Sequence, residues 1–433
     1  MYRRACQTIA IVLMVLNFSP MALTAFGQGR LLWDIQQDFD GGTDIVRDIT
    51  LSKKTAVVVG NGGPEDDFII EALGKASGAV QWSEHVPAFP GVSTGVQVTR
   101  FQGIVFASGY TTGPAVSSTD ISVRAYDAST GALLWSNVWD AGRDDSPQAI
   151  AANRAAVVVV GQGGNVVPGE PIHLLVRAYE PATGAVLWED RLNDVESAAW
   201  GVTLNRNRVF VAGTTFPSPS SRDLLLRAYD ISTGHLEWEV ARPSVSPVEV
   251  KFGAGHLFVA GSEATNASPY LAAFDAKTGA LVWDDTVPAS GSGLFSDVRV
   301  KGERVVAVGR SGRSLVVRAY DALTGVLQWE DAPAVDPGFF EFASAVDFNT
   351  DAVYVAATSE KAFEYAEIVV RAYSAADGAL LWDDRSHRSA MSAALAVALG
   401  RNRLFVGGFA TGSRFDFVVR AYDIRPDRAL ASD

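Results

Sequence analysis

The residues best suited to metal chemistry are the aspartates of the segment DFDGGTD, residues 38–44. Asp38, Asp40 and Asp44 place three carboxylates on one short, glycine-containing stretch. Calcium binds such oxygen-rich loops, although the spacing here differs from that of a helix-flanked calcium loop. We therefore expect either a calcium site or a polar connection between two strands. The cluster of Glu65, Asp66 and Asp67 allows the same two interpretations.

Two aromatic groups have the chemistry to contact a ligand or a partner. Trp139 and Trp200 lie outside the repeated motif described below, and an exposed indole can stack on a planar or sugar ligand. The alternative is that they cover a neighbouring structural unit. Phe339, Phe340 and Phe342 form a second group, which could contact a partner or pack within a loop.

Other common site chemistries find little support in this sequence. The histidines lack metal-ligand spacing, which argues against zinc; they are His85, His173, His235, His256 and His387. Cys6 is the only cysteine. It falls in an N-terminal segment that we expect to be removed, so the mature chain would have no disulfide and no c-type haem attachment.

The N-terminus has the features of a secretory signal over residues 1–27. Arg3 and Arg4 precede an apolar stretch, residues 9–18, and a small-residue cleavage site follows at residues 25–27. The apolar stretch is too short to span a bilayer, and no other segment of the sequence could do so. We therefore predict a protein exported to the bacterial periplasm or the extracellular space, without a transmembrane segment.

Charge narrows the range of partners. The chain of 433 residues has a formal net charge of −13. An acidic protein repels phosphate backbones, so we do not expect a nucleic-acid partner.

The candidate residues are positioned by an internal repeat, whose clearest copy is RAYDASTGALLW at residues 124–135. Close copies begin at Arg177, Arg227, Ala272 and Arg318, and looser ones at Glu71 and Arg371. Within each copy, a strand precedes a turn that starts at aspartate and closes at glycine, and a second strand ends at tryptophan. Two further strands precede each copy. Repeated four-stranded units of about 45 to 55 residues are typical of β-propeller blades.

The two ends of the chain complement each other. The last copy stops after Asp423 without its final strand, whereas residues 29–33 (GRLLW) match the end of a copy that has no beginning. An N-terminal strand that completes the C-terminal blade would close the ring and leave only short, protected edges. We therefore predict an all-β, eight-bladed propeller that occupies residues 28–433 as a single domain.

The pattern A-x-D-x-x-T-G-x-x-x-W, complete for example at residues 125–135 and 228–238, resembles the repeat of the pyrroloquinoline quinone (PQQ) propellers. This superfamily includes quinoprotein alcohol dehydrogenases and the propeller subunit of the outer-membrane protein assembly machinery. The resemblance implies that each tryptophan docks on the alanine of its repeat and on the backbone of the adjacent repeat. That structural role would fall on Trp33, Trp82, Trp135, Trp188, Trp238, Trp283, Trp329 and Trp382.

An arginine precedes the alanine in most copies, and an acidic residue follows most of the tryptophans, as in Arg177 with Glu189 and Arg227 with Glu239. Both face away from the alanine–tryptophan contact because side chains alternate along a strand. We expect cross-strand ion pairs on the outer strands, each contributing little if exposed to solvent.

The connections divide into two classes that a propeller places on opposite rims. The short turns between first and second strands are basic, whereas the long connections vary and many are acidic. Loops on a rigid scaffold commonly carry function. We therefore expect a non-catalytic module without a cofactor, which binds a protein or glycan on its loop-rich acidic rim.

The alternative is an alcohol or sugar dehydrogenase that depends on PQQ and calcium. The resemblance implies that such enzymes use adjacent cysteines and a Glu, Asn and Asp set. The single cysteine excludes the first feature, and no matching acid set can be identified in this sequence.

Overall fold

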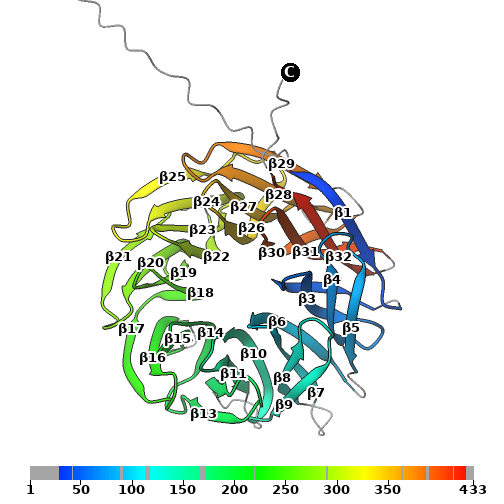
Figure 1. Cartoon of the computed structure of the whole chain (residues 1–433). Coiled ribbons are helices and arrows are strands. Elements are labelled where there is room, and N and C mark those ends of the chain that lie inside the picture. Colours follow the sequence, from blue (N-terminus) through cyan, green and yellow to red (C-terminus); the bar gives the residue numbers. More distant parts are fainter. Residues whose placement is uncertain are drawn as a thin grey trace, which may run out of the picture.

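Eight four-stranded antiparallel sheets are arranged in a ring around a central opening (Figure 1). This is a computed structural model, and it describes residues 29–425 except 41, 88–90, 113–117, 165–170, 219, 289–290, 362–363, 387–389 and 413. The expected signal segment, Cys6 and His387 lie outside the described residues. The prediction of an all-β propeller with eight blades is confirmed.

The inner half of each blade consists of the first two strands of its unit. The innermost strands are β2 (Ile45–Leu51), β6 (Ser93–Phe101), β10 (Arg143–Ala152), β14 (Ser197–Leu204), β18 (Val245–Gly253), β22 (Leu294–Lys301), β26 (Phe339–Phe348) and β30 (Ser392–Leu399). The second strands are β3 (Thr55–Gly62), β7 (Ile104–Thr112), β11 (Val157–Gly164), β15 (Arg208–Thr215), β19 (His256–Glu263), β23 (Arg304–Ser311), β27 (Ala352–Lys361) and β31 (Arg403–Thr411).

The outer half of each blade is formed by the repeated motif. The third strands are β4 (Asp67–Gly74), β8 (Thr119–Asp127), β12 (His173–Tyr179), β16 (Asp223–Asp230), β20 (Ser268–Asp275), β24 (Ser314–Asp321), β28 (Tyr365–Ser374) and β32 (Phe415–Asp423). The outermost strands are β5 (Val80–Val86), β9 (Leu133–Trp139), β13 (Val186–Arg191), β17 (Leu236–Arg242), β21 (Leu281–Thr286), β25 (Leu327–Asp331), β29 (Leu380–Ser386) and β1 (Arg30–Gln37).

The N-terminal strand closes the ring, as the sequence predicts. β1 pairs antiparallel with β32, so blade 8 has the strand order β1-β32-β31-β30 (Figure 1). The pairing joins Asp34 to Arg420 and Ile35 to Val419. β1 thereby covers the edge of β32 and gives the last blade the same four strands as the other seven.

The turn of the repeat shows why its residue types recur. In blade 2, Asp127 Oδ1 accepts hydrogen bonds from the backbone N–H of Ser129 (3.0 Å) and Thr130 (2.9 Å). Hydrogen bonds from the Ser129 and Thr130 side chains and backbone lower the pKa of Asp127 to about 2. Gly131 follows at φ +73°, a conformation that favours glycine.

Two kinds of connection lie on opposite rims. The backbone N–H of Ala128 bonds the carbonyl of Gly103 at 2.8 Å, and that of Ala322 bonds Glu303 at 2.8 Å. These bonds place the first-to-second and third-to-fourth strand turns on one side, here called the short-turn rim. The second-to-third strand loops and the connections between blades form the other side, the loop-rich rim.

The hydrophobic core is divided among the contacts between adjacent blades. One cluster, for example, combines Val158 and Val176 of blade 3 with Val202 and Val211 of blade 4. In the part of the chain that the structure describes, no helix is long and apolar enough to cross a membrane.

Candidate binding site on the loop-rich rim

Tryptophans of the repeat join neighbouring blades. Trp135 Nε1 donates to the carbonyl of Pro181 in the next blade at 3.0 Å, and its ring stacks on Tyr179 with centroids 5.8 Å apart. Equivalent bonds to a carbonyl of the next blade come from Trp33, Trp82, Trp188, Trp283 and Trp329. Trp382 stacks on Tyr422, while Trp238 packs where a side chain on Gly279 would collide with it. These eight residues therefore belong to the scaffold that positions the rims.

Four arginines of the repeat are buried, which makes their predicted cross-strand partners more important than those of an exposed pair; they are Arg227, Arg318, Arg371 and Arg420. Arg227 is 8% exposed and pairs with Glu239 of its own blade, as expected, but also with Asp190 of the preceding blade. Tyr229 donates to the same Asp190 carboxylate at 2.8 Å. The same bridge to the preceding blade recurs at Arg124–Glu84, Arg318–Asp285 and Arg420–Asp384. Sequence reasoning missed these acids, although their position two residues after the tryptophan is a visible signal.

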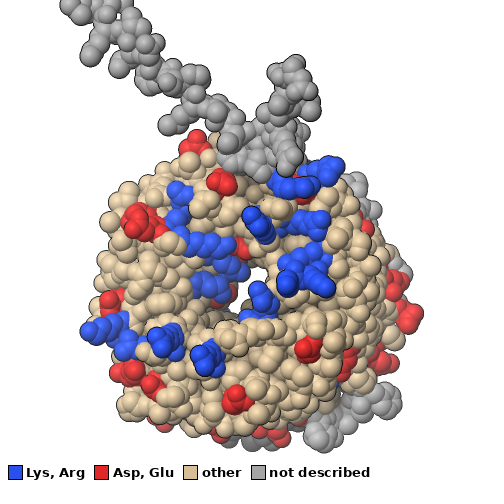
Figure 2. Space-filling view, viewed as in Figure 1, with Lys and Arg blue, Asp and Glu red and all other residues tan. Residues whose placement is uncertain are grey.

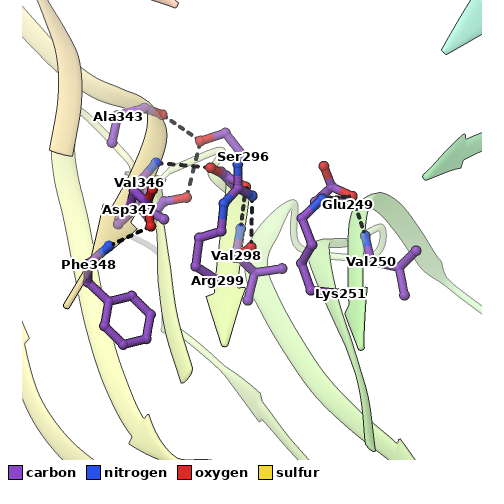
Figure 3. Close-up of polar contacts among 12 residues, drawn as sticks. Glu249, Val250, Lys251, Ser296, Val298, Arg299, Ala343, Val346, Asp347 and Phe348 are labelled. Carbon is purple, nitrogen blue, oxygen red and sulfur yellow. Dashed lines mark hydrogen bonds and ion pairs between the residues drawn. The ribbon is translucent and has the colours of Figure 1, made fainter. Parts of the chain in front are cut away.

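Around the central opening, charged side chains tie successive innermost strands together (Figure 3). Asp297 of β22 accepts the backbone N–H of Val298 through Oδ1 and that of Val346, in the next blade, through Oδ2 at 2.9 Å. Ser296 donates to the carbonyl of Ala343 at 2.5 Å, and Arg299 bonds Asp297 Oδ1 at 2.5 Å. This part of the channel is thus built as a connection between blades 6 and 7.

Three channel carboxylates, Asp48, Asp297 and Asp347, share one pattern of backbone hydrogen bonds. Asp48 repeats the arrangement of Asp297, with Oδ1 accepting Ile49 N–H and Oδ2 accepting Val98 N–H of the next blade. Asp347 does the same toward Phe348 and Leu399. Burial raises the pKa of Asp48 to about 6, against the effect of these bonds and of Arg299. Because protein donors already engage both oxygens of each carboxylate, these groups serve as structural ties.

The two candidate ligand-stacking tryptophans differ in position. Trp139 ends β9, the outermost strand of its blade, and therefore lies away from the innermost strands that surround the opening. It is 5% exposed, and the Arg177 guanidinium lies 4.0 Å from its ring centroid, so little ring surface remains for a ligand. Trp200 lies on the innermost strand β14 at a bulge between Ala199 and Gly201. Its indole is half-buried and donates to Thr214 Oγ1 at 2.9 Å.

The predicted aspartate site is assembled differently from the sequence expectation. Asp38 and Asp44 lie with Asp416, and one carboxylate oxygen of each is within 4.8 Å of the others. Asp40 is not a member of this group; it is exposed and has φ 66°. Asp416 was missed because it lies at the opposite end of the chain and reaches the site only through ring closure.

The phenylalanine group on β26 separates two hollows on the loop-rich rim. Phe340 and Phe342 line a hollow of about 540 Å³ together with Leu294 and Ala343. Arg310 and Glu360 add one charge of each sign to its wall.

Residues of opposite parity on β26 line a second hollow, of about 620 Å³. Glu341, 5% exposed, bonds Arg371 at 3.0 Å and Arg385 at 2.7 Å. Arg385 also pairs with Glu367 at 3.1 Å, while Phe339 packs edge-on against Tyr365. Phe340 and Phe342 thus line the first hollow with apolar rings, whereas the second hollow contains a closed network of ion pairs. The first hollow therefore has the greater capacity for an apolar group of a partner.

The predicted contrast between a basic and an acidic rim is incomplete, because the turns of the short-turn rim also carry acidic residues; they include Asp127, Glu180, Asp230, Asp275 and Asp321. Figure 2 shows one face of the ring, where Lys and Arg gather around the opening and Asp and Glu lie mostly toward the edge. The turns of the short-turn rim carry Lys53, Lys54, Arg154, Arg206 and Arg401. The loop-rich rim carries Asp66, Asp140, Asp194, Glu196, Asp336 and Glu364.

The comparison with known families follows the repeat. The model described as outer membrane protein assembly factor BamB matches residues 119–251 and 222–366, which together span more than half of the 433 residues. The chain belongs to this family. No curated protein matches the sequence significantly.

Solved structures show how widely the fold is used. BamB from Moraxella catarrhalis is 16% identical, with 92% of this chain and 98% of that chain aligned and a TM-score of 0.55. The quinohemoprotein alcohol dehydrogenase ADHIIG from Pseudomonas putida HK5 is 14% identical over 93% of this chain and 77% of that chain, with a TM-score of 0.61. The computationally designed Ika8 protein is 16% identical over 90% and 100%, with a TM-score of 0.58. These matches establish the propeller fold, and a fold alone does not determine function.

Proposed function

We propose that this chain is an exported, non-catalytic propeller that binds a protein partner through its loop-rich rim. The observation that carries the proposal is the hollow of about 540 Å³ beside the central opening, lined by Phe340, Phe342 and Leu294. An aromatic-lined hollow with a polar margin is the kind of surface where a partner's apolar side chains dock. A glycan would instead require an exposed aromatic face with surrounding hydrogen-bond donors.

Two further observations support this proposal. The family to which the chain belongs is described as an assembly factor, a role performed by binding other proteins. Asp48, Asp297 and Asp347, which lie around the channel, accept backbone hydrogen bonds from the next blade. Their arrangement therefore supports a rigid ring that presents its rim.

The binding site can be tested by site-specific photo-crosslinking. A photoreactive phenylalanine analogue is placed at Phe342, and another at Val326, which is 62% exposed on the short-turn rim. In cells of the source organism, the probe at position 342 is expected to give a defined crosslinked protein, and the probe at 326 is not. The variant Phe340→Asp should reduce the recovery of that protein at least tenfold, whereas Val326→Asp should leave it unchanged.

The opposing outcome is equally specific. Equal crosslinking from both rims, or recovery that is insensitive to Phe340→Asp, would remove the hollow as the docking site.

A titration with PQQ, with and without calcium, tests the dehydrogenase alternative. A ligand that binds only the folded state raises its melting temperature. Stabilisation that requires both PQQ and calcium, together with a bound-quinone absorbance, would replace the proposal with the enzyme.

A further inference from the structure

A second group of three carboxylates lies on the loop-rich rim where blade 2 meets blade 3. Asp120 is the second residue of β8, Asp140 directly follows β9, and Asp145 belongs to β10. One carboxylate oxygen of each lies within 4.8 Å of the others. Asp145 is fully buried and Asp120 is 4% exposed, whereas Asp140 is open to solvent.

Few donors among the described residues compensate this negative charge; one of them is the backbone N–H of Gly142, which donates to Asp140 Oδ1 at 3.1 Å. Asp145 Oδ2 accepts the backbone N–H of Ala141 at 2.5 Å, but its Oδ1 is buried with no hydrogen-bond partner among the described residues. Arg191 donates to the carbonyl of Ala141 at 2.6 Å, and its buried Nε likewise has no partner in the described part of the chain.

The Asp38, Asp44 and Asp416 group provides an internal comparison, because it occupies the same position between blades 8 and 1. Asp416 precedes the repeat arginine by four residues, as Asp120 does, and Asp38 directly follows the outermost strand, as Asp140 does. Both groups contain one exposed and two buried carboxylates.

The two groups differ in the protein donors that they receive. Asp44 Oδ1 accepts Gly63 N–H at 2.8 Å and its Oδ2 accepts Phe39 N–H at 2.7 Å. Asp416 Oδ2 accepts the Gln36 side-chain amide at 2.7 Å. The residue equivalent to Gln36 in blade 2 is Val138, which has no side-chain donor. Among the described residues, the blade 2–3 group therefore lacks the equivalents of two donors, the Gly63 N–H and the Gln36 side-chain amide, that stabilise the blade 8–1 group.

We propose that Asp120, Asp140 and Asp145 bind a divalent cation, Ca²⁺. Carboxylate oxygens are the preferred ligands of this hard cation, and ligand atoms on opposite sides of one ion are about 5 Å apart at calcium–oxygen distances of 2.3–2.6 Å. The unpartnered, buried Asp145 carboxylate supplies a fixed anionic ligand, and exposed Asp140 leaves the site accessible to water and to the incoming ion. A bound ion would join two strands of blade 2 to the innermost strand of blade 3.

Calorimetry and thermal melting of the chelator-treated full chain test this proposal. We expect one Ca²⁺ per chain and a melting temperature that rises with Ca²⁺. Asp140→Asn removes an exposed ligand without touching the core, and should weaken binding at least tenfold and abolish the thermal shift. The matched variant Asp38→Asn, at the equivalent position of the blade 8–1 group, should bind Ca²⁺ as the unmodified chain does.

Three results would overturn the assignment. They are no heat of binding at millimolar Ca²⁺, unchanged affinity in Asp140→Asn, or loss of binding in Asp38→Asn with retention in Asp140→Asn. Near-ultraviolet circular dichroism of each variant establishes that it is folded, so that a loss of affinity reports on the site. The test uses Ca²⁺ alone, so its outcome is independent of the PQQ titration and of partner binding.

Discussion

At the residue scale, the turn glycines define how closely neighbouring blades approach. A Cβ on Gly131 would lie 2.6 Å from the indole of Trp82 in the preceding blade, and the residue also has φ +73°. The glycine of each motif is therefore needed both for the turn and for the docking of a tryptophan. The glycine of one motif receives the tryptophan of the preceding blade, and the tryptophan of that motif docks on the glycine of the next blade. This explains why the two residues recur together in every motif.

We predict that Gly131→Ala destabilises the protein more than Gly103→Ala. Gly103 has φ +118°, and a Cβ there would meet no atom within 4 Å, so its variant carries backbone strain without the clash. The overlap with Trp82 should add about 1–3 kcal/mol to the loss of unfolding free energy. Thermal and denaturant melts of both variants provide the measurement, and equal melting temperatures would show that Trp82 moves aside freely.

Glu71 predicts a specific pH dependence. It replaces the repeat arginine in blade 1, is 2% exposed, and its Oε1 has no partner among the described residues. Burial raises its pKa to about 7, against a smaller opposing effect of the Gln37 side chain. In the unfolded chain this carboxyl ionises near its ordinary pKa of 4.5, whereas in the folded chain it keeps its proton up to about pH 7. Stability therefore falls as the pH rises between these two values.

Glu71→Gln should remove this loss. We expect the variant to match the unmodified chain at pH 4 and to exceed its unfolding free energy by about 2–3 kcal/mol at pH 7.5. Denaturant melts across this range provide the measurement. Identical profiles for the two proteins would mean that Glu71 is ionised and compensated in the fold.

Sequence analysis located single residues well only where the partners were close in the chain. Asp38 and Asp44 do share a site, but Asp416 replaces Asp40 because ring closure brings distant segments together. The blade 2–3 carboxylates went unrecognised as a group because they come from three different strands or connections. The aspartate four residues before the repeat arginine, present at Asp120 and Asp416, was the available signal.

At the scale of elements, ion pairs connect the outer strands of one blade with those of the next. The sequence predicted the pairs within a blade, such as Arg227 with Glu239, from the alternation of side chains along adjacent strands. It could not show the second partner, Asp190, because contacts between sheets depend on how blades pack. Burial of the arginine makes this second partner important, since a charge removed from water needs compensation.

Replacing Arg227 with methionine should therefore be costly. The variant leaves Asp190 and Glu239 without their shared cation, and Tyr229 loses a neighbouring donor. Because both carboxylates are partly exposed, we expect a loss of about 2–3 kcal/mol, below the range for fully buried pairs. Arg30→Met is the control: Arg30 is 73% exposed, pairs with Asp423 at 3.5 Å, and should cost less than about 1 kcal/mol. Equal losses in the two variants would contradict a bridging role for Arg227.

At the scale of the whole molecule, the fold was predictable because every level of the sequence agreed. The repeat gave the number of blades, and the incomplete copies at the two ends gave the closure, both of which the structure confirms. The hollow at Phe340 and Phe342 was less accessible to sequence analysis because it combines residues of two blades. The repeat specifies the scaffold, whereas the rim residues that distinguish one propeller from another vary between copies.

Ring closure makes the stability of the whole molecule depend on one strand. β1 contributes seven paired positions to β32, and Trp33 donates to the carbonyl of Lys75 in blade 1. A chain that begins at Asp38 would lose the outermost strand of blade 8 and a tie between the two ends of the ring. It would also expose the edge of β32, which invites aggregation. We expect its melting temperature to fall by about 10 °C or more, because several buried contacts are lost together.

A synthetic peptide of residues 28–38 should restore that melting temperature in a concentration-dependent manner, since it binds only the folded ring. The same peptide with Trp33→Ala should bind at least tenfold more weakly, because it lacks the indole that packs against Phe405 and bonds Lys75. Differential scanning fluorimetry across a peptide titration measures both effects. If the truncated chain melted like the full chain, or if both peptides acted equally, β1 would be an accessory strand and the ring would be held by blade-to-blade packing alone.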